Sequence, residues 1–151
     1  MELLIVVAII GILAAIAIPN ILVAIQRAKQ KRTMADIKTI SLAWETRAAD
    51  YGQYNAAGAG LLGASNPIFI TDVEVMVTPT YVKSIPHFDG WNHPFNIYLD
   101  QPLNGARAET YVIVSAGKDG IFDSNPATGA ISNFDCDIIF SNGQFVSFPP
   151  Q

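Results

Sequence analysis

The chain has 151 residues, which is enough for one domain with a single modest core. Hydrophobic residues make up 50% of it and charged residues only 15%, and the mean hydropathy is +0.30. This composition is too apolar for an ordinary soluble domain, so we expect apolar surface that faces lipid or partner subunits. The net charge of −4 argues against nucleic acid as a partner, because nucleic-acid binding needs a basic surface. Cys136 is the only cysteine, so no disulfide can form within the chain.

The N-terminal segment from Leu3 to Ile25 contains no charged residue, and fifteen of its residues are Leu, Ile or Val. As an α-helix it is roughly 35 Å long, enough to cross a bilayer core of about 30 Å. We therefore predict a transmembrane or filament-core segment over residues 1–25. The alternative is a cleavable signal peptide with a small-residue site at Ala15-Ile16-Ala17. The acidic Glu2 argues against that alternative, because a signal peptide begins with basic residues.

After Gln26, apolar residues recur at spacings of three or four, which is typical of one face of an amphipathic helix. They are Met34, Ile37, Ile40, Trp44, Ala48 and Tyr51. Gly52 is a suitable residue for the end of this helix. The pattern predicts one helix from about residue 2 to about residue 51. Its first half is apolar on all sides, and its second half, 26–51, is amphipathic.

The loop region 52–94 joins this helix to the rest of the domain. Glycine and alanine are frequent in residues 52–70, which predicts a loop. A short helical or extended piece is expected at about Asp72–Val77. The stretch from Pro86 to Pro94 contains Asp89-Gly90 and other turn residues, so we expect a turn there.

Four runs rich in β-branched and aromatic residues follow, and Asn-Gly pairs in their connections are typical of hairpins. The runs are Phe95–Leu99, Thr110–Ser115, Asp137–Phe140 and Gln144–Phe148, with turns at Asn104-Gly105 and Ser141-Asn142-Gly143. We predict an α+β fold in which the amphipathic helix half covers one face of a small antiparallel sheet. The globular domain, 26–151, then consists of the helix 26–51, the loop region 52–94, and the sheet with an acidic loop over 95–151.

Three stretches of the sequence resemble one family. The segment from Glu2 to Asn20 has its Glu, Gly, Pro and Asn residues where the N-terminal segments of type IV pilins and type II secretion pseudopilins have them. Gly90-Trp91-Asn92-His93-Pro94-Phe95 is similar to a Trp-Gly-Asn-Pro-aromatic motif of the major pseudopilin. Ser115–Gly120 and Asp135–Ile138 are similar to the two sides of its calcium loop. The chain thus resembles the type IV pilin-like family, and most closely the major pseudopilin of type II secretion systems.

The resemblance implies a pilin fold and a structural subunit of a type II secretion-like pseudopilus, which polymerises through its N-terminal helix. It implies assembly roles for Glu2 and Pro19, with the Glu2 carboxylate paired to the N-terminal amine of the adjacent subunit. Because a lone charge inside an apolar bundle is costly, such a pair would fix the axial register. Without a partner, Glu2 would be a solvated carboxylate at the membrane edge. The other implied partners are minor pseudopilins, an inner-membrane assembly platform and, before assembly, membrane lipid.

The implied location is the bacterial inner membrane, crossed once with the C-terminal domain in the periplasm, and afterwards a periplasmic or cell-surface filament. The basic cluster of Arg27, Lys29, Lys31 and Arg32 by itself favours a cytoplasmic position for this end of the segment. The resemblance implies the opposite orientation. In the family, an aromatic residue begins the mature chain a few positions before the glutamate. We therefore expect the DNA upstream of the Met1 codon to encode a basic leader, a glycine and that aromatic start.

Carboxylates bracket a long segment from Ala116 to Asp135. They are Asp119, Asp123, Asp135 and Asp137. Carboxylates and backbone carbonyls are the ligands that Ca²⁺ prefers. The spacing is not that of an EF-hand, however, and spacing alone favours a solvated acidic loop. The resemblance implies a structural Ca²⁺ site with Asp119 and Asp135 or Asp137 as side-chain ligands and Asp123 as an additional candidate. We expect few apolar anchors within this acidic loop.

The nearest alternative function is that of a type IV pilus major pilin, acting in adhesion, twitching or DNA uptake. Many such pilins end in a disulfide-bonded loop, which a single cysteine cannot form. A more distant alternative is a single-pass membrane-anchored periplasmic binding protein. The sequence contains no nucleophile elbow, P-loop or zinc-protease motif, so we predict that the chain is not an enzyme. His87 and His93 are expected to be turn or surface residues.

Overall fold

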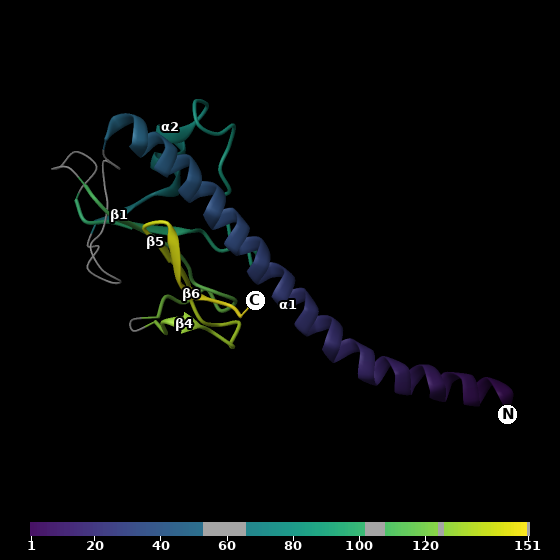
Figure 1. The fold of residues 1–151 in the computed structure, drawn as a ribbon. Helices are drawn as coiled ribbons and strands as arrows, with labels where there is room; N and C mark the ends of the chain where they lie inside the picture. Colours follow the sequence, from purple (N-terminus) through teal and green to yellow (C-terminus); the bar gives the residue numbers. More distant parts are fainter. Residues whose placement is uncertain (53–65, 102–107, 124–125, 151) are drawn as a thin grey trace.

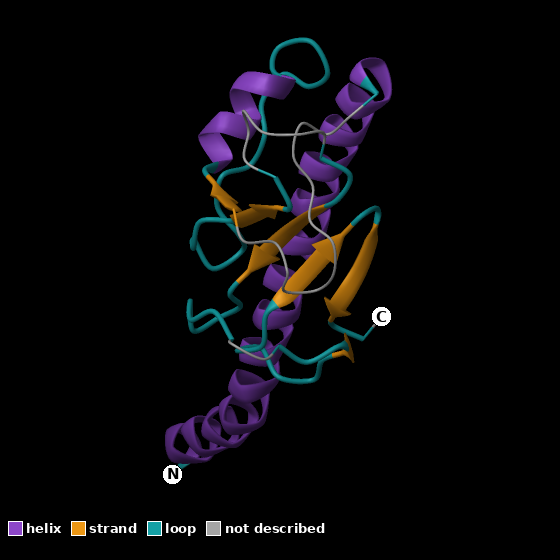
Figure 2. Cartoon of the chain, turned by 90° about the vertical axis from the view of Figure 1, so that its left-hand side faces the viewer, coloured by secondary structure: helices purple, strands orange, loops and turns teal. Residues whose placement is uncertain are grey.

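The computed structural model describes residues 1–52, 66–101, 108–123 and 126–150. The C-terminal half of one long helix packs against a β-sheet, and its N-terminal half projects away from the globular domain (Figure 1). In the view turned by 90°, the strands lie across this helix (Figure 2). The arrangement confirms the predicted α+β, pilin-like fold.

Helix α1 runs without interruption from Glu2 to Tyr51, as predicted, and includes Pro19. It ends at Gly52, whose φ of 67° is in the left-handed region that glycine adopts without a steric penalty. Large apolar side chains between Leu3 and Ile25 are 41–78% exposed. The buried residues of the same helix begin only at Gln30. The two halves of α1 are therefore suited to different surroundings.

Within the described residues the sheet has six strands in the order β1-β2-β3-β5-β6-β4. The strands are β1 (Asn66–Ile68), β2 (Asn96–Leu99), β3 (Tyr111–Ser115), β4 (Gly129–Ala130), β5 (Ile138–Ser141) and β6 (Gln144–Phe148). Neighbouring strands are antiparallel except β4 and β6, which are parallel. The predicted turn between β5 and β6 has Asn142 and Gly143 at positive φ, as an Asn-Gly hairpin requires. Helix α2 (Ile70–Val77) follows β1 and includes the piece expected at 72–77.

The main core lies between α1 and the sheet. Trp44 is fully buried, and its ring centroid lies 5.0 Å from that of Tyr111 on β3. Ile37 and Ile40 are also fully buried and belong to the same cluster. The Tyr111 hydroxyl donates a hydrogen bond to the carboxylate of Glu45, one residue after Trp44. Each large side chain buried here contributes about 1.5–3 kcal/mol, so this cluster holds the amphipathic half of α1 on the sheet.

Two segments that the sequence predicts as loops contain strands. Residues 66–68, inside the predicted loop 52–70, form β1 and pair with β2. The acidic loop contains β4, whose neighbour Ile131 is 3% exposed. The ring centroid of Phe122 also lies 6.0 Å from that of Tyr98. The expectation of few apolar anchors in the acidic loop was therefore wrong. The strands β1 and β4 were missed because strands of two or three residues are too short to show a period in the sequence.

Two further predictions lie outside the described residues. They are the glycine- and alanine-rich run at 55–60 and the turn at Asn104-Gly105.

Candidate functional site

The first candidate site is the exposed apolar half of α1. By length and composition α1 could cross a membrane, and it is the one such helix in the described part of the chain. Its most apolar 18-residue window has a mean hydropathy of 2.7, and none of that window is buried. Glu2 is exposed at the start of this surface. Contiguous apolar surface of this extent marks a contact with lipid or with other proteins.

The turn at residues 88–94, here called the docking turn, attaches the middle of α1 to the sheet. The backbone N–H of Gly90 donates to the Thr33 hydroxyl on α1 at 2.9 Å. A β-carbon at Gly90 would collide with the backbone carbonyl group of Lys29. Glycine is therefore required at this position for the turn to approach the helix so closely.

Asp89 is buried in the docking turn, with 3% exposure, and its carboxylate accepts the hydrogen bonds that hold the turn in place. Its Oδ1 atom accepts hydrogen bonds from the backbone N–H groups of Trp91 at 2.8 Å and His93 at 2.9 Å. Its Oδ2 atom accepts a hydrogen bond from the Ser115 hydroxyl at 2.7 Å. In this conformation of the turn, the indole N–H of Trp91 donates a hydrogen bond of 2.7 Å to Oε1 of Gln26 on α1. Asp89 thus connects β3, the docking turn and α1.

His93 connects the docking turn to the acidic loop. Its Nδ1 atom lies 3.0 Å from the carbonyl oxygen of Gly117. Because a carbonyl oxygen can only accept, Nδ1 carries the hydrogen. The ring also lies against Gly120, where an added β-carbon would be 2.9 Å from Nε2. His93 is a turn residue as predicted, but the sequence did not predict its contact with the acidic loop.

Asp137 is the most enclosed of the predicted calcium ligands, with 1% exposure. Its Oδ2 atom accepts a hydrogen bond from the backbone N–H of Asp123 at 3.0 Å. Its Oδ1 atom is buried and has no hydrogen-bond partner within the described residues. Burial raises the pKa of Asp137 to about 6; the N–H of Asp123 lowers it, and the charges of Asp123 and Asp119 raise it further. A buried carboxylate oxygen without a donor is stabilised by a proton or by a cation.

Asp119 and Asp135 already have other partners. Asp119 accepts a hydrogen bond from the N–H of Ile121 at 3.0 Å, and the Asp135 carboxylate lies 3.5 Å from the ammonium group of Lys118. No three His, Cys, Asp or Glu side chains of the described chain lie together in a group that could hold a metal ion. The structure therefore brings Asp123 and Asp137 into contact but does not gather all four predicted ligands.

The acidic loop nevertheless offers some of the oxygen ligands that a calcium ion requires. Asp137 offers a buried oxygen without a donor, and the backbone carbonyl oxygens of residues 135–136 lie beside Gly117, which has a φ of 63°. Carboxylate and carbonyl oxygens are what Ca²⁺ takes as ligands. Asp119 and Asp123 are near enough for their charges to act on Asp137. An ion bound there requires the Asp119 and Asp123 side chains to turn toward it.

Three buried polar residues in this part of the molecule were not predicted from the sequence. Asp89 was predicted only as a turn residue, since nothing local indicates that its carboxylate is buried. Gln30 and Thr33 are 4% and 0% exposed. Their positions continue the three- and four-residue spacing of Ile37 and Ile40 backwards along the helix, which is the signal that could have identified them.

Comparisons with known proteins are consistent with this geometry. The family model for type II secretion system protein G matches residues 20–134. The type II secretion system core protein G of Aeromonas hydrophila is 27% identical over 121 residues, which is 80% of this chain and 80% of that protein. The comparison with solved structures gave no match. The range matched by the family model includes the docking turn, Asp119 and Asp123, whereas Glu2 lies before it and Asp137 after it.

Proposed function

The chain belongs to the family of type II secretion system protein G and is a structural subunit of a pseudopilus, and from this premise we propose how it assembles. The subunits polymerise through the apolar half of α1. One observation carries this proposal: the large apolar side chains from Leu3 to Ile25 are 41–78% exposed in the single subunit. Packing these helices together removes that surface from water. The family match supports this secretion function over the type IV pilus alternative.

Before assembly, the same helix half anchors the subunit in the bacterial inner membrane. In this proposal it crosses the membrane once, with the globular domain on the periplasmic side. The subunit then leaves the membrane for the filament, with minor pseudopilins and an inner-membrane assembly platform as its partners. Lipid and neighbouring helices are equivalent surroundings for an apolar helix, so the transfer exchanges one apolar contact for another.

Glu2 sets the register of the polymer in this proposal. It is the one ionisable side chain in the first 26 residues, and it begins the apolar surface. Inside a bundle of apolar helices a carboxylate is stable only beside a cation, and the N-terminal amine of an adjacent subunit supplies one. Pro19 lies further along the same surface and removes one backbone donor there, which gives α1 a position at which it can bend.

A structural calcium ion in the acidic loop completes the proposal. Asp137 would hold it through the buried Oδ1 atom, with Asp119, Asp123 and the carbonyl oxygens of the loop as further ligands. The ion would supply positive charge to a group of carboxylates that otherwise repel one another. Asp135 is the weakest candidate, because its carboxylate is paired with Lys118.

The direct test of the assembly proposal is the variant Glu2→Ala. It is expressed in cells that carry the other components of the secretion system, and filaments are quantified in the sheared fraction. The variant should enter the membrane as the natural chain does, because an apolar helix loses nothing when its charge is removed. Filaments should be lost or irregular, since the register-setting pair is absent.

The matched control is Glu109→Ala, which removes a carboxylate from the exposed surface of the globular domain. This variant should form normal filaments. Normal filaments from Glu2→Ala, at natural membrane levels of the subunit, would show that assembly does not depend on the buried pair.

A further inference from the structure

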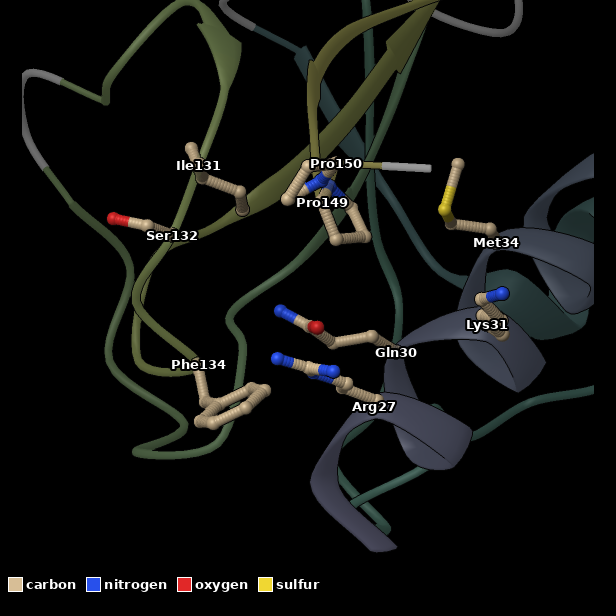
Figure 3. Close-up of a pocket in the computed structure, with 9 residues that line it drawn as sticks. All are labelled: Arg27, Gln30, Lys31, Met34, Ile131, Ser132, Phe134, Pro149 and Pro150. Atoms are coloured by element: carbon tan, nitrogen blue, oxygen red, sulfur yellow. The ribbon is translucent and has the colours of Figure 1, made fainter. Parts of the chain in front are cut away.

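A cavity of about 630 Å³ lies where the apolar half of α1 meets the globular domain. The residues that line it are Arg27, Gln30, Lys31 and Met34 of α1 and Ile131, Ser132, Phe134, Pro149 and Pro150 of the facing segments. Figure 3 shows Arg27 and Gln30 extending from the helix toward Ser132 and Phe134. The cavity therefore has two cationic side chains on its helix side, and four apolar side chains and Ser132 on the other.

The position of the cavity along α1 places it at the level of lipid headgroups. Arg27 and Lys31 follow Ile25 by two and six residues, which is roughly 3 Å and 9 Å at 1.5 Å per residue. A bilayer measures about 30 Å across its hydrocarbon core and about 40–45 Å with its headgroups, so each headgroup layer is roughly 5–8 Å thick. When residues 3–25 cross the membrane, Arg27 therefore lies within the headgroup layer and Lys31 lies at its outer edge.

The polar side chains that line the helix side of the cavity carry hydrogen-bond donors. Arg27 and Lys31 form no ion pair within the part of the chain that the structure describes. Gln30 is 4% exposed, and it lines the cavity between Arg27 and Met34. A guanidinium, an ammonium and an amide N–H together match a compact anion rich in oxygen atoms.

We propose that this cavity binds the headgroup of an anionic phospholipid of the surrounding leaflet. Its phosphate oxygens accept hydrogen bonds from Arg27, Gln30 and Lys31, and the alcohol group attached beyond the phosphate contacts Met34 and Phe134. The site is continuous with the apolar half of α1, so the acyl chains of the same lipid can lie along the helix. This inference depends on the insertion of α1 into a membrane, which the family membership supports, and not on polymerisation.

The test uses the full chain, reconstituted in bilayers of phosphatidylglycerol and phosphatidylcholine in equal amounts. The subunit is then extracted in a mild detergent, and native mass spectrometry measures the lipids that remain bound. The natural chain should retain phosphatidylglycerol over phosphatidylcholine by about thirtyfold, since Arg27 and Lys31 each contribute about 1 kcal/mol toward anionic lipid near a membrane surface. Equal retention of the two lipids by the natural chain would overturn the proposal.

Two double variants with the same change in charge distinguish lipid binding in the cavity from general electrostatic attraction of the chain to anionic lipid. Arg27→Gln with Lys31→Gln should lose the preference for phosphatidylglycerol. Lys29→Gln with Arg32→Gln removes two cations of the same stretch of helix that do not line the cavity, and should keep it. Equal loss in both double variants would overturn the proposal in favour of unspecific attraction. Circular dichroism checks that each variant retains the helix content of the natural chain.

A third variant, Gln30→Leu, removes the amide from the cavity lining without changing the charge. It should lower the retention of phosphatidylglycerol several-fold, because the phosphate loses a donor inside the cavity. Retention equal to that of the natural chain would show that the anion does not enter the cavity. If Arg27→Gln with Lys31→Gln keeps the lipid preference but forms no filaments, the cations serve a neighbouring subunit, and the lipid proposal is overturned.

Discussion

The hydroxyl of Ser115, at the end of β3, donates a hydrogen bond to the buried carboxylate of Asp89 in the docking turn at 2.7 Å. Both residues are buried, with 0% and 3% exposure. The next residue of the turn, Gly90, donates to Thr33 on α1. A short chain of buried polar contacts therefore fixes the sheet relative to the helix that carries the filament-forming surface.

Replacing Asp89 with alanine should destabilise the globular domain by about 3 kcal/mol or more. The change leaves the N–H groups of Trp91 and His93 and the Ser115 hydroxyl without their acceptor, and each buried unsatisfied donor costs about 1–3 kcal/mol. Urea unfolding of residues 26–151 measures the effect, since the buried residues of α1 begin at Gln30 and this part contains its own core.

The matched control for this change is Glu109→Ala, which removes an exposed carboxylate and should alter the free energy of unfolding by less than about 0.5 kcal/mol. An effect of Asp89→Ala as small as that of the control would show that Asp89 does not organise the docking turn.

Calcium should stabilise the same domain if the acidic loop binds it. At about 100 times its Kd, a ligand that binds only the folded state adds about 2.7 kcal/mol, so the melting temperature should rise by several degrees. Magnesium should have a much smaller effect, because it prefers a smaller octahedral shell and retains its waters. Thermal unfolding in millimolar calcium, in magnesium and in EDTA makes the comparison.

The variant Asp119→Ala should lose the calcium response and keep its helix and sheet, because Asp119 is exposed and its hydrogen bond to Ile121 is local. Identical melting curves of the natural domain in calcium and EDTA would contradict the calcium site. The acidic loop would then be a solvated surface.

Replacing Asp137 with asparagine should stabilise the calcium-free domain at pH 7. Folding raises the pKa of Asp137 from 3.8 to about 6, so its ionised form is unfavourable in the folded state. The loss of folding free energy caused by the ionised Asp137 is complete above pH 6 and disappears as the pH falls to 3.8. A pKa difference of about two between the folded and unfolded states sets an upper limit of about 3 kcal/mol on this loss. The variant should therefore be more stable than the natural domain in EDTA at pH 7, and the two should converge at pH 4.

Calcium reverses this comparison at pH 7, because the ion stabilises the carboxylate and not the amide. The measurement is urea unfolding of both domains at pH 4 and pH 7, with calcium or EDTA. A natural domain that is more stable than the variant in EDTA at pH 7 would mean that the buried Oδ1 atom has a partner in solution.

The long helix could be predicted from the sequence, with its ends expected at about residues 2 and 51, where the structure has them. Its apolar run, the spacing of Ile37, Ile40 and Trp44, and the terminal Gly52 are local signals that act over many turns. The strand β6 and its Asn142-Gly143 turn were predicted for the same reason, since the turn chemistry and the alternation coincide.

Contacts between distant segments could not be predicted in this way. β1 and β4 have three and two residues, and their pairing depends on where β2 and β6 already lie. The burial of Asp89 follows from Ser115, 26 residues later, and from the approach of the docking turn to α1. The candidate ligand Asp137 was identified from sequence, but its enclosed Oδ1 atom and its contact with Asp123 required the fold.

The central claim, that the exposed apolar half of α1 becomes the interior of a polymer, has one direct measurement. In a Cys136→Ser background, Ile16→Cys places a thiol on the apolar half and Lys83→Cys places one on the exposed surface of the globular domain. Filaments sheared from cells are treated with a water-soluble maleimide before and after denaturation. The account predicts that Ile16→Cys reacts only after denaturation, whereas Lys83→Cys reacts in both states. Equal reaction of Ile16→Cys in intact and denatured filaments would contradict it.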